Sequence, residues 1–145
     1  EAPAVEIIKA CQVTNVGGID DKSFNSTAWK GITDAIEKFG ADKIEGKYLE
    51  SQQASDYEVN INSFLTDKCT LIITVGFLLA DATDAAAKAN PDQKFATIDV
   101  DYLTHPNLRG SGFARGAGCL GVRVGGAACH RYRFSVEPSA DGGNC

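Results

Sequence analysis

The hydrophobic positions of this chain change period along the sequence, from short apolar runs to helical spacing and back. Runs rich in β-branched residues predict strands at 5–14, 43–50, 70–77, 94–100 and 107–113. Apolar residues three and four positions apart predict helices at 24–39, 55–68 and 78–90. Alternation of strands and helices with short connections predicts an α/β fold: a parallel sheet covered on both faces by helices, in three α/β/α layers.

Parallel sheets of this kind bind ligands beyond the carboxyl ends of their strands. In this sequence those ends fall at 14–25, 50–55, 74–78 and 99–102. Candidate functional residues are therefore expected in these four segments.

Composition narrows the possible classes of function. The chain has 145 residues, 43% of them hydrophobic, which is enough for one globular domain with its own core. Its formal net charge of −5 argues against nucleic acid as a partner. No apolar run reaches the roughly 18 residues of a membrane span. The turn that follows the first predicted strand carries neither a GxGxxG nor a GK[ST] motif, and we expect no cofactor.

The glycine-rich turn "GGIDDKSFN", residues 17–25, is compatible with more than one kind of site. A phosphate loop is disfavoured because Asp20 and Asp21 would stand where the anion binds. A flavodoxin-like metal-dependent signalling or enzymatic domain could use these two carboxylates together with Asp99. However, the acidic pair comes well after the strand end, so we favour helix capping by Asp20, Asp21 or Ser23.

Phe24 and Asn25 stand at the start of the first predicted helix. Phe24 fits the apolar stripe of that helix, which favours core packing, but its ring could also stack on a planar ligand while Asn25 hydrogen-bonds to the ligand's edge. Asp99 ends an otherwise apolar strand, where a carboxylate can accept two hydroxyl hydrogen bonds from a sugar diol. Gly76 allows close approach to the backbone, and Phe77 supplies a second aromatic ring.

The cysteines and histidines do not indicate an enzyme. Cys11 and Cys69 lie in or next to predicted strands and are interpreted as small buried hydrophobic residues. Cys129-His130 has no partner at the spacing of metal ligands. No nucleophile–base pair is evident, so we predict a protein without catalytic or metal-binding residues.

The last part of the chain departs from the pattern of the rest. All nine lysines lie at or before Lys94, and all five arginines lie at or after Arg109. Residues 114–145 are rich in Gly, Arg and Cys and lack a sustained period, which predicts an irregular or disordered tail. Such a change is typical of GC-rich DNA translated out of frame. We therefore hypothesise that the native reading frame ends near residues 110–114.

Five long motifs resemble one family in the order in which they occur. They are "VTNVGGIDDKSFNSTAWKGI", "YLESQQASDYEVNINSF", "CTLIITVGFLLADAT", "NPDQKFATIDV" and "PNLRG". The family is the basic membrane lipoprotein (Bmp) family of bacterial substrate-binding proteins, which includes purine-nucleoside receptors of ABC importers. The resemblance implies that residues 1–113 form the incomplete, flavodoxin-like N-terminal lobe of a type I periplasmic-binding protein.

The resemblance also implies a function and a set of roles. The ligand would be a small molecule, a purine nucleoside, delivered to an ABC permease by a protein that is not an enzyme. Its location would be extracytoplasmic or periplasmic, with membrane attachment only through a lipid anchor that this chain does not carry. Phe24 would stack on the base, Asn25 would bind the base edge, and Asp99 would hold the ribose hydroxyls.

Gly76 and Phe77 would line the wall of this implied site. Asn15 occupies a position that is more often Asp in the family. Because an ionised Asp only accepts hydrogen bonds whereas Asn also donates them, this difference bears on which ligand binds.

Overall fold

The computed structural model describes residues 6–100, 105–116 and 119–124. The strands are β1 (Ile8–Val13), β2 (Ile44–Leu49), β3 (Leu71–Val75), β4 (Lys94–Ile98), β5 (Leu108–Gly116) and β6 (Cys119–Val124). The helices are α1 (Phe24–Phe39), α2 (Asp56–Thr66), the 3-10 turn η1 (Phe77–Leu79) and α3 (Ala80–Ala89). Each strand and helix predicted from periodicity is present within a few residues of its expected bounds.

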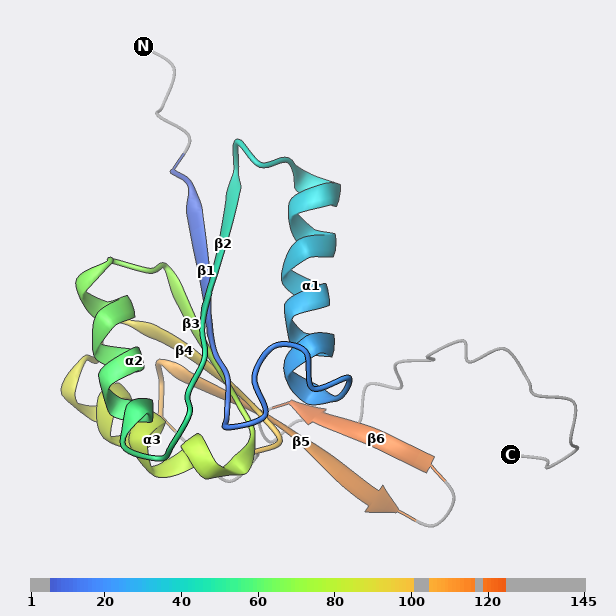
Figure 1. Ribbon diagram of the computed structural model, residues 1–145. Coiled ribbons are helices and arrows are strands. Elements are labelled where there is room, and N and C mark those ends of the chain that lie inside the picture. Colours follow the sequence, from blue (N-terminus) through green and yellow to red (C-terminus); the bar gives the residue numbers. More distant parts are fainter. Residues whose placement is uncertain (1–5, 101–104, 117–118, 125–145) are drawn as a thin grey trace, which may run out of the picture.

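The strands form one sheet in the order β2-β1-β3-β4-β5-β6. The first five strands pair in parallel, and β6 pairs antiparallel with β5. Helix α1 covers one face of the sheet, while α2 and α3 cover the other (Figure 1). The predicted three-layer α/β/α fold is therefore confirmed.

Successive residues of β1 face the two helical layers in turn. Cys11 and Val13 belong to the buried cluster shared with α2 and α3. Between them, Gln12 is fully buried and its Nε2 donates to the carbonyl oxygen of Asn25 in α1, at 2.9 Å. This bond fixes the start of α1 against β1, an interior strand of the sheet, and so positions the residues at the start of the helix.

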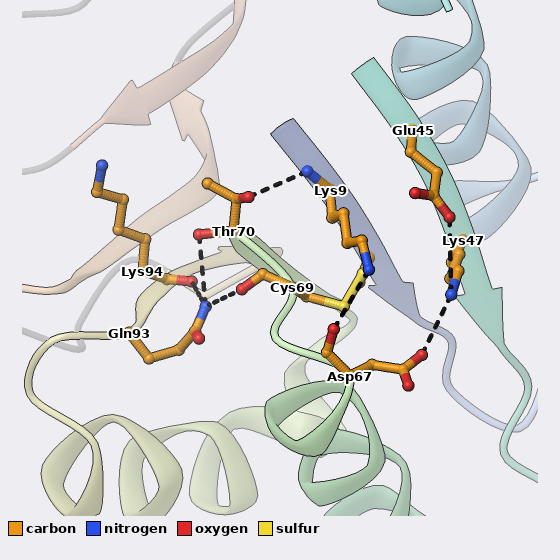
Figure 2. The surroundings of a disulfide bond; sticks show 9 residues. Lys9, Glu45, Lys47, Asp67, Cys69, Thr70, Gln93 and Lys94 are labelled. Carbon is orange, nitrogen blue, oxygen red and sulfur yellow. Dashed lines mark hydrogen bonds and ion pairs between the residues drawn. A yellow bond between two sulfur atoms is a disulfide. The ribbon is translucent and has the colours of Figure 1, made fainter. Parts of the chain in front are cut away.

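Cys11 and Cys69 form a disulfide bond with a Cα–Cα distance of 6.1 Å. Both residues are buried, as the sequence predicted, but their interpretation as merely small hydrophobic residues missed this bond. The bond links β1 to the turn between α2 and β3, where Gln93 Nε2 also donates to the Cys69 carbonyl, at 3.0 Å (Figure 2). The turn is thus attached to the sheet by covalent and polar contacts.

The C-terminal segment differs in part from the irregular tail expected from its sequence. Strand β5 continues to Gly116, and β6 follows as its antiparallel partner. A parallel edge strand offers unpaired backbone groups that any extended segment can satisfy, whatever its side-chain pattern. The remainder of the predicted tail, residues 125–145, lies outside the described residues.

Candidate functional site

Three neighbouring strands bring most of the predicted site residues to the edge of the sheet that is formed by the carboxyl ends of its parallel strands. Asn15 comes shortly after β1, Gly76 directly after β3, and Asp99 directly after β4. Phe24 and Asn25 open α1 at the same edge, since Asn25 contacts both β1 and Asn15. We take this edge as the candidate functional site.

The centre of the site is a hydrogen-bonded pair of amides. Asn15 Oδ1 accepts hydrogen bonds from the Gly17 backbone N–H, at 2.9 Å, and from Asn25 Nδ2, at 2.8 Å. Asn25 is fully buried, whereas Asn15 is partly exposed. Among the described residues, Asn25 Oδ1 and Gln12 Oε1 are buried acceptors without a hydrogen-bond partner. Hydrogen bonds therefore connect Gln12 in the sheet interior through Asn25 to the half-exposed side chain of Asn15.

Gly76 makes room for this amide. A Cβ atom on Gly76 would lie 2.7 Å from Asn15 Nδ2, so close that the Asn15 amide would have to shift. Its backbone, with φ 100° and ψ 147°, lies in a region open almost only to glycine. The Gly76 N–H donates to the Ile98 carbonyl at 3.0 Å, which joins the ends of β3 and β4. Gly76 thus holds two strand ends together beside Asn15.

Apolar side chains on two elements of the site are exposed to solvent. Phe24 is 39% exposed and Phe77 63% exposed, so neither ring is used fully in the core. Val16, in the loop after β1, and Leu78, next to Phe77, are exposed as well. Exposed apolar groups beside polar ones are typical of ligand-binding surfaces.

Asp99 adopts a left-handed backbone conformation, with φ 69°. Its N–H donates to the Ser111 carbonyl at 2.7 Å, which fixes the chain at this turn. Within the described part of the chain, its carboxylate makes no hydrogen bond. Left-handed backbone in a residue other than glycine is strained and is often found at functional sites.

Asp21 has the capping role that the sequence suggested for the acidic pair. Its carboxylate accepts hydrogen bonds from the backbone N–H groups of Ser23, Asn25 and Ser26, at 2.8, 3.0 and 3.1 Å. Desolvation alone would raise the pKa of Asp21, but these hydrogen bonds outweigh it and hold the pKa below its ordinary value. The cap fixes the entrance of α1, and with it the position of Asn25.

The metal-dependent alternative is not supported by this arrangement. Asp21 is engaged with the helix, and Asp20 is exposed. No group of three or more His, Cys, Asp or Glu residues in the described ranges could hold a metal ion.

Replacing Asp21 by alanine should lower the free energy of unfolding by about 1 kcal/mol at pH 7, the usual cost of losing a helix cap. Because the folded-state pKa is depressed, this contribution is present above the unfolded pKa of about 3.9 and is lost as pH falls through the folded value. Urea denaturation at pH 7 and near pH 3 measures both effects. Asp20→Ala is the matched control and should change little; equal losses in the two variants would contradict the cap.

Two residues of this region were not among the predicted site residues. Gln12 is an amide between the apolar residues Cys11 and Val13, and that signal could have identified it. Glu50 directly follows β2, and its Oε1 accepts from the Ile19 N–H at 2.7 Å beside Gly18. Glu50 thereby attaches the loop between β1 and α1 to the end of the neighbouring strand β2.

A cavity of about 440 Å³ lies along β2, away from Asn15 and Asp99. It is lined by side chains of α1, β2 and α2, including Trp29, Tyr48 and Phe64. The rings of Trp29 and Tyr48, which line it, pack edge to face with centroids 4.9 Å apart. None of the predicted site residues lines this cavity, so we assign it no part in the candidate site.

Comparison with known proteins places the chain in a family of transport proteins. Residues 8–115 match the family model described as "ABC transporter substrate-binding protein PnrA-like", and the chain belongs to this Bmp family. No helix among the described residues is both long and apolar enough to cross a membrane.

Two of the following three relatives carry the names of binding proteins, and both are considerably longer than this chain. The ABC transporter nucleoside-binding protein BmpA of Lactococcus lactis is 38% identical over 108 residues, which cover 74% of this chain and 31% of that protein. A solute-binding protein of an Aeropyrum pernix ABC transporter has a TM-score of 0.64 at 28% identity, over 71% of this chain and 28% of that one. A fragment of a putative lipoprotein from Peptoclostridium difficile has a TM-score of 0.63 at 27% identity, over 71% of this chain and 83% of that fragment. The chain thus spans about a third of the curated relative's length.

Proposed function

We propose that residues 1–113 are the N-terminal lobe of an ABC-importer substrate-binding lipoprotein that captures a purine nucleoside and delivers it to a permease. The observation that carries the proposal is the convergence of aromatic, amide and carboxylate groups at one sheet edge. The nucleoside-binding name of the Lactococcus relative supports the choice of ligand. In this role the protein binds and releases its ligand without chemical change, so it is not an enzyme.

Each group at the sheet edge matches one part of a nucleoside. The exposed rings of Phe24 and Phe77 offer faces on which a base can stack. Gly76 has no side chain, so the base can approach its backbone closely. Asn15, supported by Asn25, offers hydrogen bonds to the base edge. The Asp99 carboxylate can accept two hydrogen bonds from adjacent ribose hydroxyls, which is the geometry that a diol requires.

The disulfide supports an extracytoplasmic location. Structural disulfides form and persist outside the cytoplasm and are rare in reducing compartments. The buried Cys11–Cys69 bond therefore agrees with a lipoprotein attached to the outer face of the cell membrane or lying in the periplasm. The lipoprotein name of the Peptoclostridium relative points the same way.

The exposed state of the site implies weak binding by this chain alone. Tight small-molecule sites bury most of the ligand, and a single sheet edge covers one side of it. We infer that a second lobe completes the site in the whole protein. For the chain itself, we expect dissociation constants in the millimolar range, about 4 kcal/mol of binding free energy.

Titration of the isotope-labelled chain with adenosine, followed by NMR, tests this function. We expect saturable shifts of the Gly76 backbone amide and of the Asn15 and Asn25 side-chain amides. Phe24→Ala should abolish saturation, because losing a base stack costs about 1–3 kcal/mol.

Phe39→Ala is the matched control for this experiment. Phe39 is also an exposed phenylalanine of α1, but it lies at the opposite end of the helix. Its variant should bind adenosine like the unmodified chain. Equal binding by Phe24→Ala would refute the stacking role, and an absence of saturable shifts in the unmodified chain would refute nucleoside binding.

A further inference from the structure

The orientation of the Asn15 amide is determined by a neighbouring backbone group. A backbone N–H can only donate a hydrogen bond, so the atom that faces the Gly17 N–H at 2.9 Å must be the Asn15 oxygen. The same oxygen accepts from Asn25 Nδ2 at 2.8 Å. Both lone pairs of Asn15 Oδ1 are therefore occupied within the protein, and the side chain has no acceptor left for a ligand.

The orientation of Asn25 follows from that of Asn15. Since Asn15 presents its oxygen, Asn25 must present its nitrogen, and its own Oδ1 then lies buried without a partner among the described residues. Rotating the Asn25 amide by half a turn would place two oxygens face to face. The unpartnered acceptor is thus the consequence of keeping the Asn15 nitrogen on the outer side of the pair.

The Asn15 nitrogen lies beside Gly76 at the edge of the site. Nδ2 is the atom that a Cβ on Gly76 would meet at 2.7 Å, and glycine at this position leaves it uncovered. Asn15 is partly exposed, and within the described ranges its Nδ2 donates no hydrogen bond. Two N–H groups are therefore available beside Gly76, the residue that precedes Phe77.

We propose that Asn15 acts as an obligate hydrogen-bond donor that selects a purine base presenting a ring-nitrogen lone pair at this edge, and disfavours one presenting an N–H. This inference rests on the proposed nucleoside-binding function and specifies the polarity of its ligand. Asn15 is the specificity-determining group, whereas Gly17 and Asn25 are positioning residues that hold its amide. An aspartate in its place would keep both internal hydrogen bonds but would present an acceptor to the ligand.

Asn15→Asp and the probe purine riboside test this polarity. The base of purine riboside carries ring-nitrogen acceptors and no N–H, so its edge facing residue 15 presents a lone pair in whichever orientation it binds. We expect the variant to bind it about tenfold more weakly, the scale of one hydrogen bond replaced by an acceptor–acceptor contact. In the unmodified chain, the Asn15 Nδ2 protons should move downfield as purine riboside is added. The Nδ2 protons of Asn107, which donate to the carbonyl oxygens of Ala87, Asn90 and Gln93, should remain unchanged.

Two controls separate this role from a structural disturbance. Asn15→Asp should retain the melting temperature and the Gly17 amide shift, because both internal bonds persist. Lys22→Gln, which changes the charge of the same loop by one unit, should bind purine riboside like the unmodified chain. Equal binding by Asn15→Asp, or unmoved Asn15 Nδ2 protons during saturable binding, would overturn the inference alone. If the unmodified chain binds no purine nucleoside, the proposed function itself fails.

Discussion

Replacing Cys11 and Cys69 together by alanine should lower the free energy of unfolding by about 4 kcal/mol. The disulfide closes a loop with a sequence separation of 58, and without it the unfolded chain regains the conformational freedom of that loop. The free energy of unfolding of such domains is about 5–15 kcal/mol, so the loss would be a large part of the total stability. Urea denaturation of the oxidised chain and of the double variant measures the difference.

Reductant supplies the control for this experiment. Cys11 and Cys69 are buried, at 0% and 3% exposure, so a mild reductant should reach the disulfide only when the protein unfolds at least locally. The reductant should destabilise the unmodified chain and leave the double variant unchanged. A double variant within about 1 kcal/mol of the oxidised chain would show that the bond contributes little to stability.

Periodicity predicted the fold because each helix and strand buries one face or one stripe. The helix predicted at 24–39 has the same bounds in the structure. The continuous apolar run at 70–77 indicated a strand covered on both faces, and β3 lies centrally in the sheet. The β-α order then predicted parallel strands, whose carboxyl ends lie together at one end of the sheet.

Interactions between distant segments could not be read from the sequence. The partner of Cys11 depends on β3 pairing with β1, which places the turn at Cys69 beside it. Likewise, Asn25 could be placed in the first turn of a helix, but its burial depends on Gln12 and Asn15, which lie on another element. Such contacts follow from tertiary packing, for which local pattern carries no signal.

Gly76 shows the same limit at a single position. The sequence suggested that it allows close approach of a ligand, but the atom that approaches it in the structure is Asn15 Nδ2. The requirement for glycine therefore comes first from the protein's own side chain. Whether a ligand also contacts Gly76 remains a prediction of the proposed function.

Replacing Gly76 by alanine should damage both stability and binding. The backbone at φ 100° disfavours any other residue, at a cost of about 1–3 kcal/mol. The new Cβ, 2.7 Å from Asn15 Nδ2, would also displace the amide from its two hydrogen bonds. We expect a lower free energy of unfolding in urea and no saturable shift with adenosine by NMR.

Gly31→Ala is the matched control, because it adds the same methyl group where nothing lies within 4 Å. Gly31 is an interior residue of α1, where alanine stabilises a helix relative to glycine by about 0.5–1 kcal/mol. Its variant should be at least as stable as the unmodified chain and bind adenosine equally. If Gly76→Ala instead kept full stability and full binding, the close contact between Gly76 and Asn15 would not constrain the site, and the donor role assigned to Asn15 would lose its structural basis.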